Sequence, residues 1–157
     1  MRYESSVVID RPIDEVWAFI FEPFNIPRWG GGRLAFRVKS PGALGLGSSL
    51  EQRVVFFGFE SVLRTVVTEW DPPNTMTHST RHAGRLIRSA SAGLTLEATA
   101  AGTRVTRVFK LEPRGILKLV LPIVSPFVRR RGDAQTRNLK RLLEAGRGER
   151  RGSIGAL

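Results

Sequence analysis

The feature that most constrains the fold of this chain is a change of hydrophobic period near residue 113. From about residue 34 to 112, apolar and polar residues alternate in runs that end at short turns, a pattern typical of neighbouring antiparallel strands. From residue 117 to 143, apolar residues instead recur every three to four positions, which predicts one long helix. The sequence therefore predicts a sheet of consecutive strands followed by a single helix long enough to cover it.

Seven strands are expected, each ended by residues that favour turns. The first is predicted over residues 3–10, where every second side chain faces the same side. The others are expected at residues 34–38, 49–57, 59–70, 75–82, 86–99 and 103–111. The connections contain proline, glycine, asparagine and aspartate, which favour tight turns. Strands joined by such short connections are expected to form an antiparallel meander.

Two short helical segments are expected between the first two strands. Pro12 suits the first turn of a helix, because the first amides of a helix have no internal partner and proline has none to leave unpaired. Residues 13–20 follow with apolar side chains at helical spacing. Pro23 and Pro27 break this helix, and a second short helix or a turn is expected before Trp29.

The long helix is expected to be either kinked at Pro122 or restarted at Ser125-Pro126, where serine can cap and proline can open a new turn. It is expected to end near Gly146. Residues 147–157 are rich in glycine and arginine and are predicted to form a disordered basic tail. These boundaries predict one domain over residues 1–146.

The composition excludes several classes of protein. A chain of 157 residues is one ordinary domain that can bury a sizeable core. The absence of cysteine excludes disulfides, thiol chemistry and cysteine-ligated metals, and fits a cytoplasmic protein. No signal peptide is recognised. The longest apolar stretch, residues 115–128, contains Lys118 and two prolines and is shorter than the roughly 20 residues that a membrane span needs.

Six short segments run in order along residues 1–145: VIDRP at 8–12, EVW at 15–17, PRW at 27–29, VTEWDPP at 67–73, GTRVT at 102–106 and NLKRLLE at 138–144. They are similar to segments of the SRPBCC superfamily, which includes START domains, birch-pollen-allergen-like proteins and the polyketide cyclase/dehydrase family. The resemblance implies an α+β helix-grip fold, in which a curved antiparallel sheet of six or seven strands wraps around the C-terminal helix and a hydrophobic cavity lies between them. It implies no single reaction, because members include lipid carriers, receptors and cyclases.

Strand parity places two polar residues among apolar ones on the expected inner face of the sheet. Arg107 shares a face with Val105 and Phe109, and His78 shares a face with Met76. A buried arginine is costly unless it is paired or meets an anionic ligand, and the alternative is a place at the rim where it reaches water. Histidine can act as a general acid or base, and the alternative is a structural or surface role. Both are candidate catalytic residues and, with Met76 and Phe109, candidate ligand contacts.

Three further aromatic residues are candidate ligand contacts. Trp29 follows a proline break near the expected mouth of the cavity, Phe56 lies on an apolar strand face, and Phe127 lies on the long helix. Each can instead belong to the core. Trp17, on the apolar stripe of the first helix, is expected in the core.

No metal and no cofactor is expected. His78 and His82 lie four residues apart on one predicted strand, and no third ligand is identifiable. The chain lacks a Gly-x-Ser-x-Gly nucleophile motif, and its glycine runs lack the Lys-Ser/Thr of a phosphate loop. No two carboxylates stand out as an acid–base pair.

The positive charge is concentrated toward the C-terminus. More than half of the net charge of +11 lies in residues 129–157. Arg129, Arg130 and Arg131 adjoin the apolar segment 116–128, so contact with an anionic membrane is a hypothesis; the simpler interpretation is an exposed turn of helix. Nucleic acid is not favoured, because no aromatic residue follows Phe127 to interleave with the basic ones.

Three functions therefore remain open from the sequence. The leading hypothesis is binding of a small hydrophobic or amphipathic molecule in the cavity, with a polar group of the ligand meeting Arg107 or His78. The alternative is a polyketide cyclase/dehydratase-like enzyme that uses the same residues. The third is an interaction protein that uses its basic C-terminal region.

Overall fold

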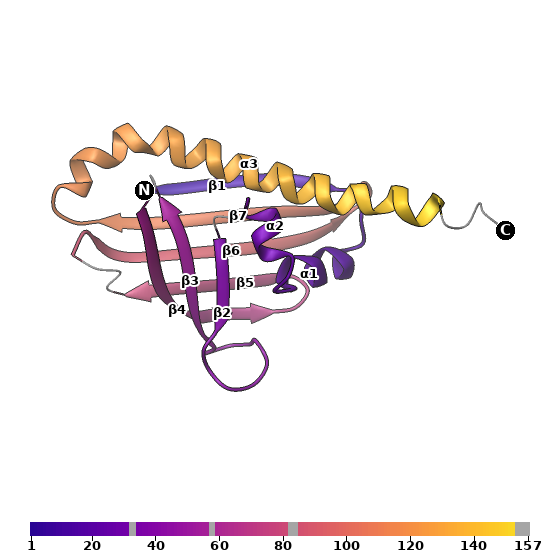
Figure 1. Cartoon of the computed structure of the whole chain (residues 1–157), viewed down its shortest axis with the longest axis horizontal. Coiled ribbons are helices and arrows are strands. Elements are labelled where there is room, and N and C mark those ends of the chain that lie inside the picture. Colours follow the sequence, from indigo (N-terminus) through magenta and orange to yellow (C-terminus); the bar gives the residue numbers. More distant parts are fainter. Residues whose placement is uncertain (32–33, 57–58, 82–84, 153–157) are drawn as a thin grey trace.

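The computed structural model describes residues 1–31, 34–56, 59–81 and 85–152 (Figure 1). Within these residues the order of elements is the predicted one: a strand, two short helices, six strands and a long helix. The elements are β1 (Arg2–Ile9), α1 (Ile13–Phe21), α2 (Ile26–Trp29), β2 (Leu34–Val38), β3 (Ser49–Phe56), β4 (Phe59–Asp71), β5 (Thr75–Arg81), β6 (Ile87–Thr99), β7 (Gly102–Pro113) and α3 (Leu117–Gly152).

All of these strands belong to one antiparallel sheet in the order β1-β7-β6-β5-β4-β3-β2. Strands β2 to β7 form the predicted meander, and β1 pairs with β7, with Tyr3 opposite Phe109 and Ser5 opposite Arg107. Directly opposite side chains share a face of an antiparallel sheet. The face toward the three helices is called the inner face below. The predicted helix-grip architecture is confirmed.

Helix α3 runs along the sheet and packs mainly against β1, with further contacts to α2 and β7 (Figure 1). Two polar contacts hold its second half in place. Lys140 Nζ donates a hydrogen bond to the carbonyl of Val8 (2.6 Å), and Arg11 Nε donates to the carbonyl of Leu143 (2.9 Å). The helix is therefore docked on the end of β1 and on the segment that leads into α1.

Two prolines lie inside α3, which continues through both of them without restarting. Pro126 has no N–H for the carbonyl of Pro122, and the hydroxyl of Ser125 donates to that carbonyl instead (3.2 Å).

Helix α3 continues to Gly152, past the expected end near Gly146, which differs from the prediction of a disordered tail starting at residue 147. Arginine and glutamate dominate residues 147–151 and favour helix. The last five residues of the predicted tail lie outside the described residues.

The hydrophobic core consists of two clusters of buried side chains on the inner face. Trp17 and Phe21 of α1 pack against both clusters, with ring centroids 4.5 Å apart, so the predicted core position of Trp17 is confirmed. The smaller cluster lies on β3, β4 and β5 and contains Leu50, Val67 and Met76. The larger cluster joins the helices to β1, β6 and β7 and contains Ile9, Val16, Ile20, Ile26, Trp29, Leu96, Val105, Leu139 and Leu143.

Candidate functional site

Arg107 of β7 points inward beneath α3. Its strand neighbour on the same face, Val105, is fully buried in the core, and Leu94 lies opposite Arg107 on β6. The guanidinium carbon lies 5.1 Å from the centroid of the Trp29 ring, at a distance typical of a cation–π contact. The guanidinium is therefore turned toward α2 and stacks on it, and the Arg107 side chain as a whole is partly exposed.

The partners of Arg107 are neutral. Both terminal nitrogens of its guanidinium donate to Oε1 of Gln135 on α3, at 3.3 and 3.4 Å. The amide nitrogen of Gln135 donates in turn to the carbonyl of Gly30 (3.2 Å), which fixes the orientation of this side chain. Burial lowers the pKa of Arg107, and nearby Tyr3 acts in the opposite direction. No carboxylate in the described part of the chain forms an ion pair with Arg107.

The carboxylate of Asp133 on α3 is held by another group. The hydroxyl of Tyr3 on β1 donates a hydrogen bond to Oδ1 of Asp133 (2.6 Å). Burial raises the pKa of Tyr3, and the hydrogen bond to Asp133 raises it further, so this hydroxyl remains a donor near neutral pH. One turn along, Ser5 Oγ and Thr136 Oγ1 lie 2.8 Å apart. Polar contacts therefore line the seam between β1 and α3 beside Arg107.

A second polar group lies across the inner face, on β5. The amide nitrogen of Gln52 on β3 lies 3.0 Å from Nε2 of His78. Burial lowers the pKa of His78 from 6.5 to about 4, so its imidazole is neutral at neutral pH and can accept this hydrogen bond. Strand β6 separates His78 from Arg107, and adjacent strands lie about 4.8 Å apart. The two groups can contact one extended ligand but not the same atom.

A buried hydroxyl near this second group has no partner. Thr65 of β4 lies opposite Leu50 on β3, so it shares the inner face with that core residue. Its Oγ1 is buried and makes no hydrogen bond within the described residues. An unsatisfied buried hydroxyl costs about 1–3 kcal/mol. Thr65 therefore offers an unused polar atom on the inner face.

The depressed pKa of His78 predicts an acid-dependent loss of stability. The unfolded histidine binds a proton near pH 6.5, whereas the folded one resists it down to about pH 4, so its contribution is present above pH 6.5 and is lost as the pH falls through this window. We expect the free energy of unfolding of the wild type, relative to His78→Gln, to fall by about 2 kcal/mol between about pH 7.5 and about pH 4.5 in urea titrations. A difference that does not change with pH would show that His78 is solvated.

The other predicted ligand contacts fall in different places. Trp29 is a core residue whose ring stacks against the guanidinium of Arg107. Its Nε1 donates a hydrogen bond to the carbonyl of Ile20 (3.3 Å). Met76 is buried in the smaller core cluster, and Phe109 is partly buried on the inner face opposite Tyr3.

Phe127 is half-exposed on α3 rather than inside the cluster around Arg107. The side chain of Phe56 and the whole of His82 lie outside the described residues. Of the predicted ligand contacts, Trp29, Arg107, His78 and Phe109 therefore form the candidate site. Met76 belongs to the core beneath them.

Three polar residues of the candidate site are not identified by the sequence patterns: Gln135, Gln52 and Thr65. Gln135 has a detectable signal, because it is a polar residue between Val128 and Leu139 on the inward stripe of the long helix. Gln52 and Thr65 alternate with charged or apolar neighbours on their strands and look like ordinary half-buried positions.

Two further features bear on the site. Within the described residues, no three His, Asp or Glu side chains are grouped so that they could hold a metal ion. No helix in the described ranges is both long and apolar enough to cross a membrane.

A family model described as "Polyketide cyclase / dehydrase and lipid transport" matches residues 1–144. No curated protein matches the sequence. The family match covers every element described above except the end of α3.

Solved structures share the fold at low sequence identity. The structure of TTHA0849 from Thermus thermophilus has a TM-score of 0.75 at 13% identity, over 93% of this chain and 99% of that one. Ara h 8.0201 has a TM-score of 0.68 at 13% identity, over 92% and 98%. The di-domain ARO/CYC BexL from the BE-7585A biosynthetic pathway has a TM-score of 0.71 at 18% identity, over 92% of this chain and 46% of that one. At these identities the similarity shows the fold alone.

Proposed function

Since the chain belongs to the polyketide cyclase/dehydrase and lipid transport family, we propose that it binds a small hydrophobic or amphipathic molecule between the inner face of its sheet and α3. The ligand places an anionic or carbonyl oxygen against Arg107. Its apolar body lies along the inner face, across Leu94 and Phe109, toward His78 on β5.

The observation that carries this proposal is an inward guanidinium with neutral partners. Burying a charge costs several kcal/mol unless a counter-charge or strong hydrogen bonds replace its water. The two bonds from Arg107 to Gln135, at 3.3 and 3.4 Å, converge on one oxygen and are long. A carboxylate or enolate would accept from the same two nitrogens in a bidentate, charge-assisted arrangement. The protein thus holds the Arg107 guanidinium in a fixed orientation, and the ligand would supply its counter-ion.

The surroundings of Arg107 favour an amphipathic ligand over a fully polar one. The Trp29 ring lies beneath the guanidinium, and Phe109 and Leu94 lie beside it on the inner face. Beyond them Ala92 lies opposite both Phe109 and His78, and such a small side chain leaves space above the strand. The partnerless Thr65 hydroxyl offers one more hydrogen bond to a polar group at the far end.

The test compares two ligands that differ only in their head group. Dodecanoate and dodecanol are titrated against the protein, with displacement of a fluorescent apolar dye as the measurement. Arg107→Gln is expected to weaken dodecanoate binding by at least about tenfold, which corresponds to about 1.4 kcal/mol, and to leave dodecanol binding within about twofold. Arg104→Gln, an exposed position on the same strand, is the matched control and is expected to bind both ligands as the wild type does.

Two outcomes would overturn the proposal. One is failure of the wild type to bind either ligand. The other is an equal loss of acid and alcohol binding in Arg107→Gln, which would mean that the substitution disturbs the inner face rather than a head-group contact. Thermal unfolding of each variant separates this second case from general destabilisation.

The alternative function is a cyclase/dehydratase-like reaction, in which His78 moves a proton on a bound chain. The Gln52 contact orients the imidazole, and the similarity in fold to ARO/CYC BexL is compatible with such a role. The pKa of about 4 makes His78 a weak base at neutral pH, however. Binding is therefore the better-supported function.

A further inference from the structure

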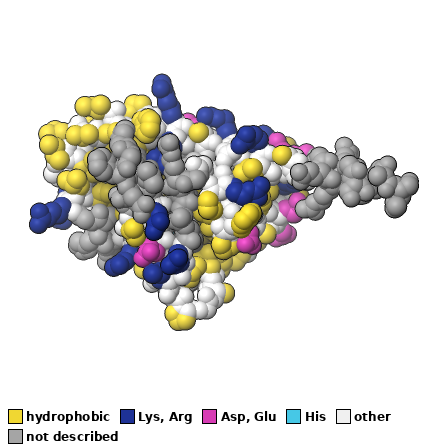
Figure 2. All heavy atoms as spheres, viewed as in Figure 1, with side chains coloured by type: hydrophobic (Ala, Val, Ile, Leu, Met, Phe, Trp, Pro, Cys, Tyr) yellow, Lys and Arg dark blue, Asp and Glu magenta, His cyan; other side chains and the backbone are white. Residues whose placement is uncertain are grey.

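The first half of α3 and the residue before it present a row of large apolar side chains to water. Ile116 is 65% exposed, Leu119 75% and Ile123 81%. Val120 and Phe127 are half-exposed and complete the row at a spacing of three to four residues, so that all five lie on one face of the helix. These five residues are called the apolar face below, and Figure 2 shows hydrophobic side chains gathered where this part of α3 lies.

This grouping is unusual for a surface. Other exposed large apolar residues, such as Phe24 and Leu46, lie singly on loops. Single exposed apolar residues are ordinary, whereas contiguous patches of several hundred Å² mark interaction sites. The apolar face is not occupied by the sheet, because the inward stripe of the same helix, with Leu121 and Val124, is turned toward it and is less exposed. Its most exposed members, Ile116, Leu119 and Ile123, therefore remain accessible to a partner.

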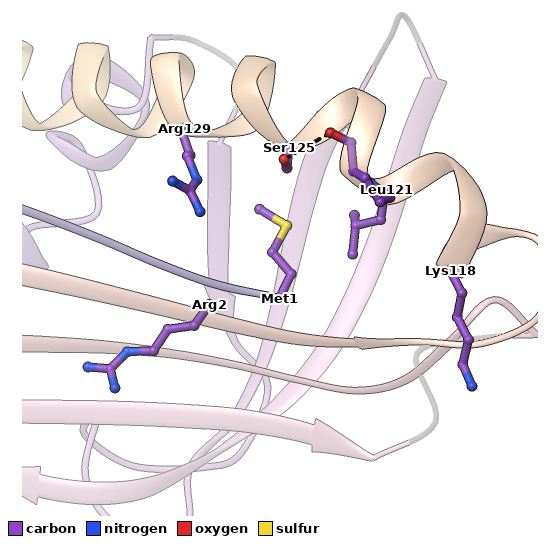
Figure 3. A pocket seen from close by; sticks show the side chains of 7 residues that line it. Met1, Arg2, Lys118, Leu121, Ser125 and Arg129 are labelled. Atoms are coloured by element: carbon purple, nitrogen blue, oxygen red, sulfur yellow. Dashed lines mark hydrogen bonds between the residues drawn. The ribbon is translucent and has the colours of Figure 1, made fainter.

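Positive charge accompanies the apolar face, and negative charge is absent from its segment. Residues 113–132 contain one lysine and four arginines and no aspartate or glutamate. Lys118 and Arg129 line one flank of α3, together with Arg2 of β1, around a groove of about 280 Å³ (Figure 3). Arg130 is exposed and follows Phe127 by three residues, so it extends the line of the apolar face. Arg130 thus lies in line with the apolar face, whereas Lys118 and Arg129 point from the same segment toward β1.

We propose that the apolar face docks on the surface of an anionic lipid bilayer. Ile116, Leu119 and Ile123 enter the boundary between head groups and acyl chains, while Arg130 contacts lipid phosphates and carboxylates and the positive charge of residues 113–132 attracts the anionic surface. Such binding lies in the plane of the interface and needs no spanning helix. Basic residues near an anionic surface strengthen such binding, and burial of the aliphatic side chains adds to it.

The same observations disfavour other partners. A second copy of the chain would bring two sets of cations together in a protein whose net charge is already +11. Protein interfaces rely on tyrosine, tryptophan and arginine anchors, whereas the apolar face is aliphatic apart from Phe127. Single-stranded nucleic acids stack on aromatic rings, which the aliphatic residues here do not provide. A bilayer matches both the aliphatic composition and the charge.

The test is flotation of the purified full chain with vesicles. Vesicles of phosphatidylcholine and phosphatidylserine are expected to carry the protein upward, and pure phosphatidylcholine vesicles are expected to bind at least about tenfold less. Leu119→Gln combined with Ile123→Gln is expected to reduce binding to the anionic vesicles by at least about tenfold. Both residues are exposed, so thermal unfolding should be unchanged. Leu46→Gln, at an equally exposed apolar residue elsewhere, is the matched control and is expected to bind as the wild type does.

The charge contribution has its own variant and its own control. Arg130→Gln is expected to weaken binding and to reduce its dependence on salt, whereas Arg64→Gln on β4 is expected to have no effect. Arg107→Gln is expected to bind vesicles normally, which keeps this proposal separate from ligand binding. Equal flotation of wild type and Leu119→Gln/Ile123→Gln would overturn the proposal. A dimer in solution that dissociates when the same two residues are substituted would also overturn the proposal. In that case a second copy of the chain would cover the apolar face.

Discussion

Replacing Gly102 with alanine is expected to lower the free energy of unfolding by about 4 kcal/mol, the largest loss expected from any single methyl group added to this chain. Gly102 opens β7 with a φ of +122°, a conformation that side-chain-bearing residues rarely adopt. A Cβ atom here would lie 2.9 Å from the Cα of Asp10 and closer still to the carbonyl oxygen of Ile9. Chemical denaturation measures the effect.

The atoms that a Cβ on Gly102 would meet are backbone atoms, which cannot move aside as a flexible side chain can. Ile9 is completely buried, and its carbonyl accepts a hydrogen bond from the amide of Arg11 (2.8 Å). Gly115 provides the matched control, because it also has a positive φ, of 55°, but a Cβ there would meet nothing within 4 Å. Gly115→Ala is expected to cost only about 1 kcal/mol. Similar losses in the two variants would show that strain of the backbone, and not the clash with β1, governs Gly102.

The order and type of the elements are predictable from the sequence, because each rests on local chemistry. The turn at Gly102 needs a residue that tolerates positive φ, and the change of period after residue 113 separates strands from helix without reference to anything distant. The predicted end of α3 at Gly146 is too early, because glycine often ends a helix but the arginines and glutamate beyond it favour helix.

The candidate site is only partly predictable. Strand parity groups Arg107 with Val105 and Phe109, and His78 with Met76, but it leaves open whether either side chain lies inside or at a rim. Their partners cannot be predicted, because Gln135 lies 28 residues from Arg107 and Gln52 lies 26 residues from His78. Such contacts depend on how far α3 slides along β1 and on how strongly the sheet curves, and neither quantity has a local signal in the sequence.

The rotation of α3 about its own axis is also hidden in the sequence. Residues 116–128 are apolar on almost every side, so their spacing does not say which of them face the sheet. The structure turns Leu121 and Val124 inward and leaves Leu119, Ile123 and Phe127 outward. This is why Phe127, a predicted ligand contact, belongs to the apolar face instead. The surplus of apolar side chains is itself informative, because a helix that only covered a sheet would need one apolar stripe.

Gly132 of α3 packs closely against Tyr3 of β1, and disruption of this contact is the second large effect expected. A Cβ atom on Gly132 would lie 2.7 Å from both Cζ and Oη of Tyr3, and closer to Cε1. The Tyr3 ring cannot move aside freely, because its hydroxyl donates a hydrogen bond to Asp133. Gly132→Ala is therefore expected to destabilise the protein by about 3 kcal/mol, even though alanine favours helix by about 1 kcal/mol.

Two comparisons separate this clash from an ordinary helix effect. Gly146→Ala, on the same helix but with nothing within 4 Å of the added Cβ, is expected to be neutral or to stabilise by up to about 1 kcal/mol. Tyr3→Ala in the Gly132→Ala background should recover part of the loss, as a coupling energy of at least about 1 kcal/mol in a double-mutant cycle. Since Gln135 lies one turn beyond Gly132 and holds Arg107, Gly132→Ala should also weaken dodecanoate binding. If Gly132→Ala proves as stable as Gly146→Ala, α3 does not lie this close to β1. The position of Gln135 next to Arg107 would then be wrong as well.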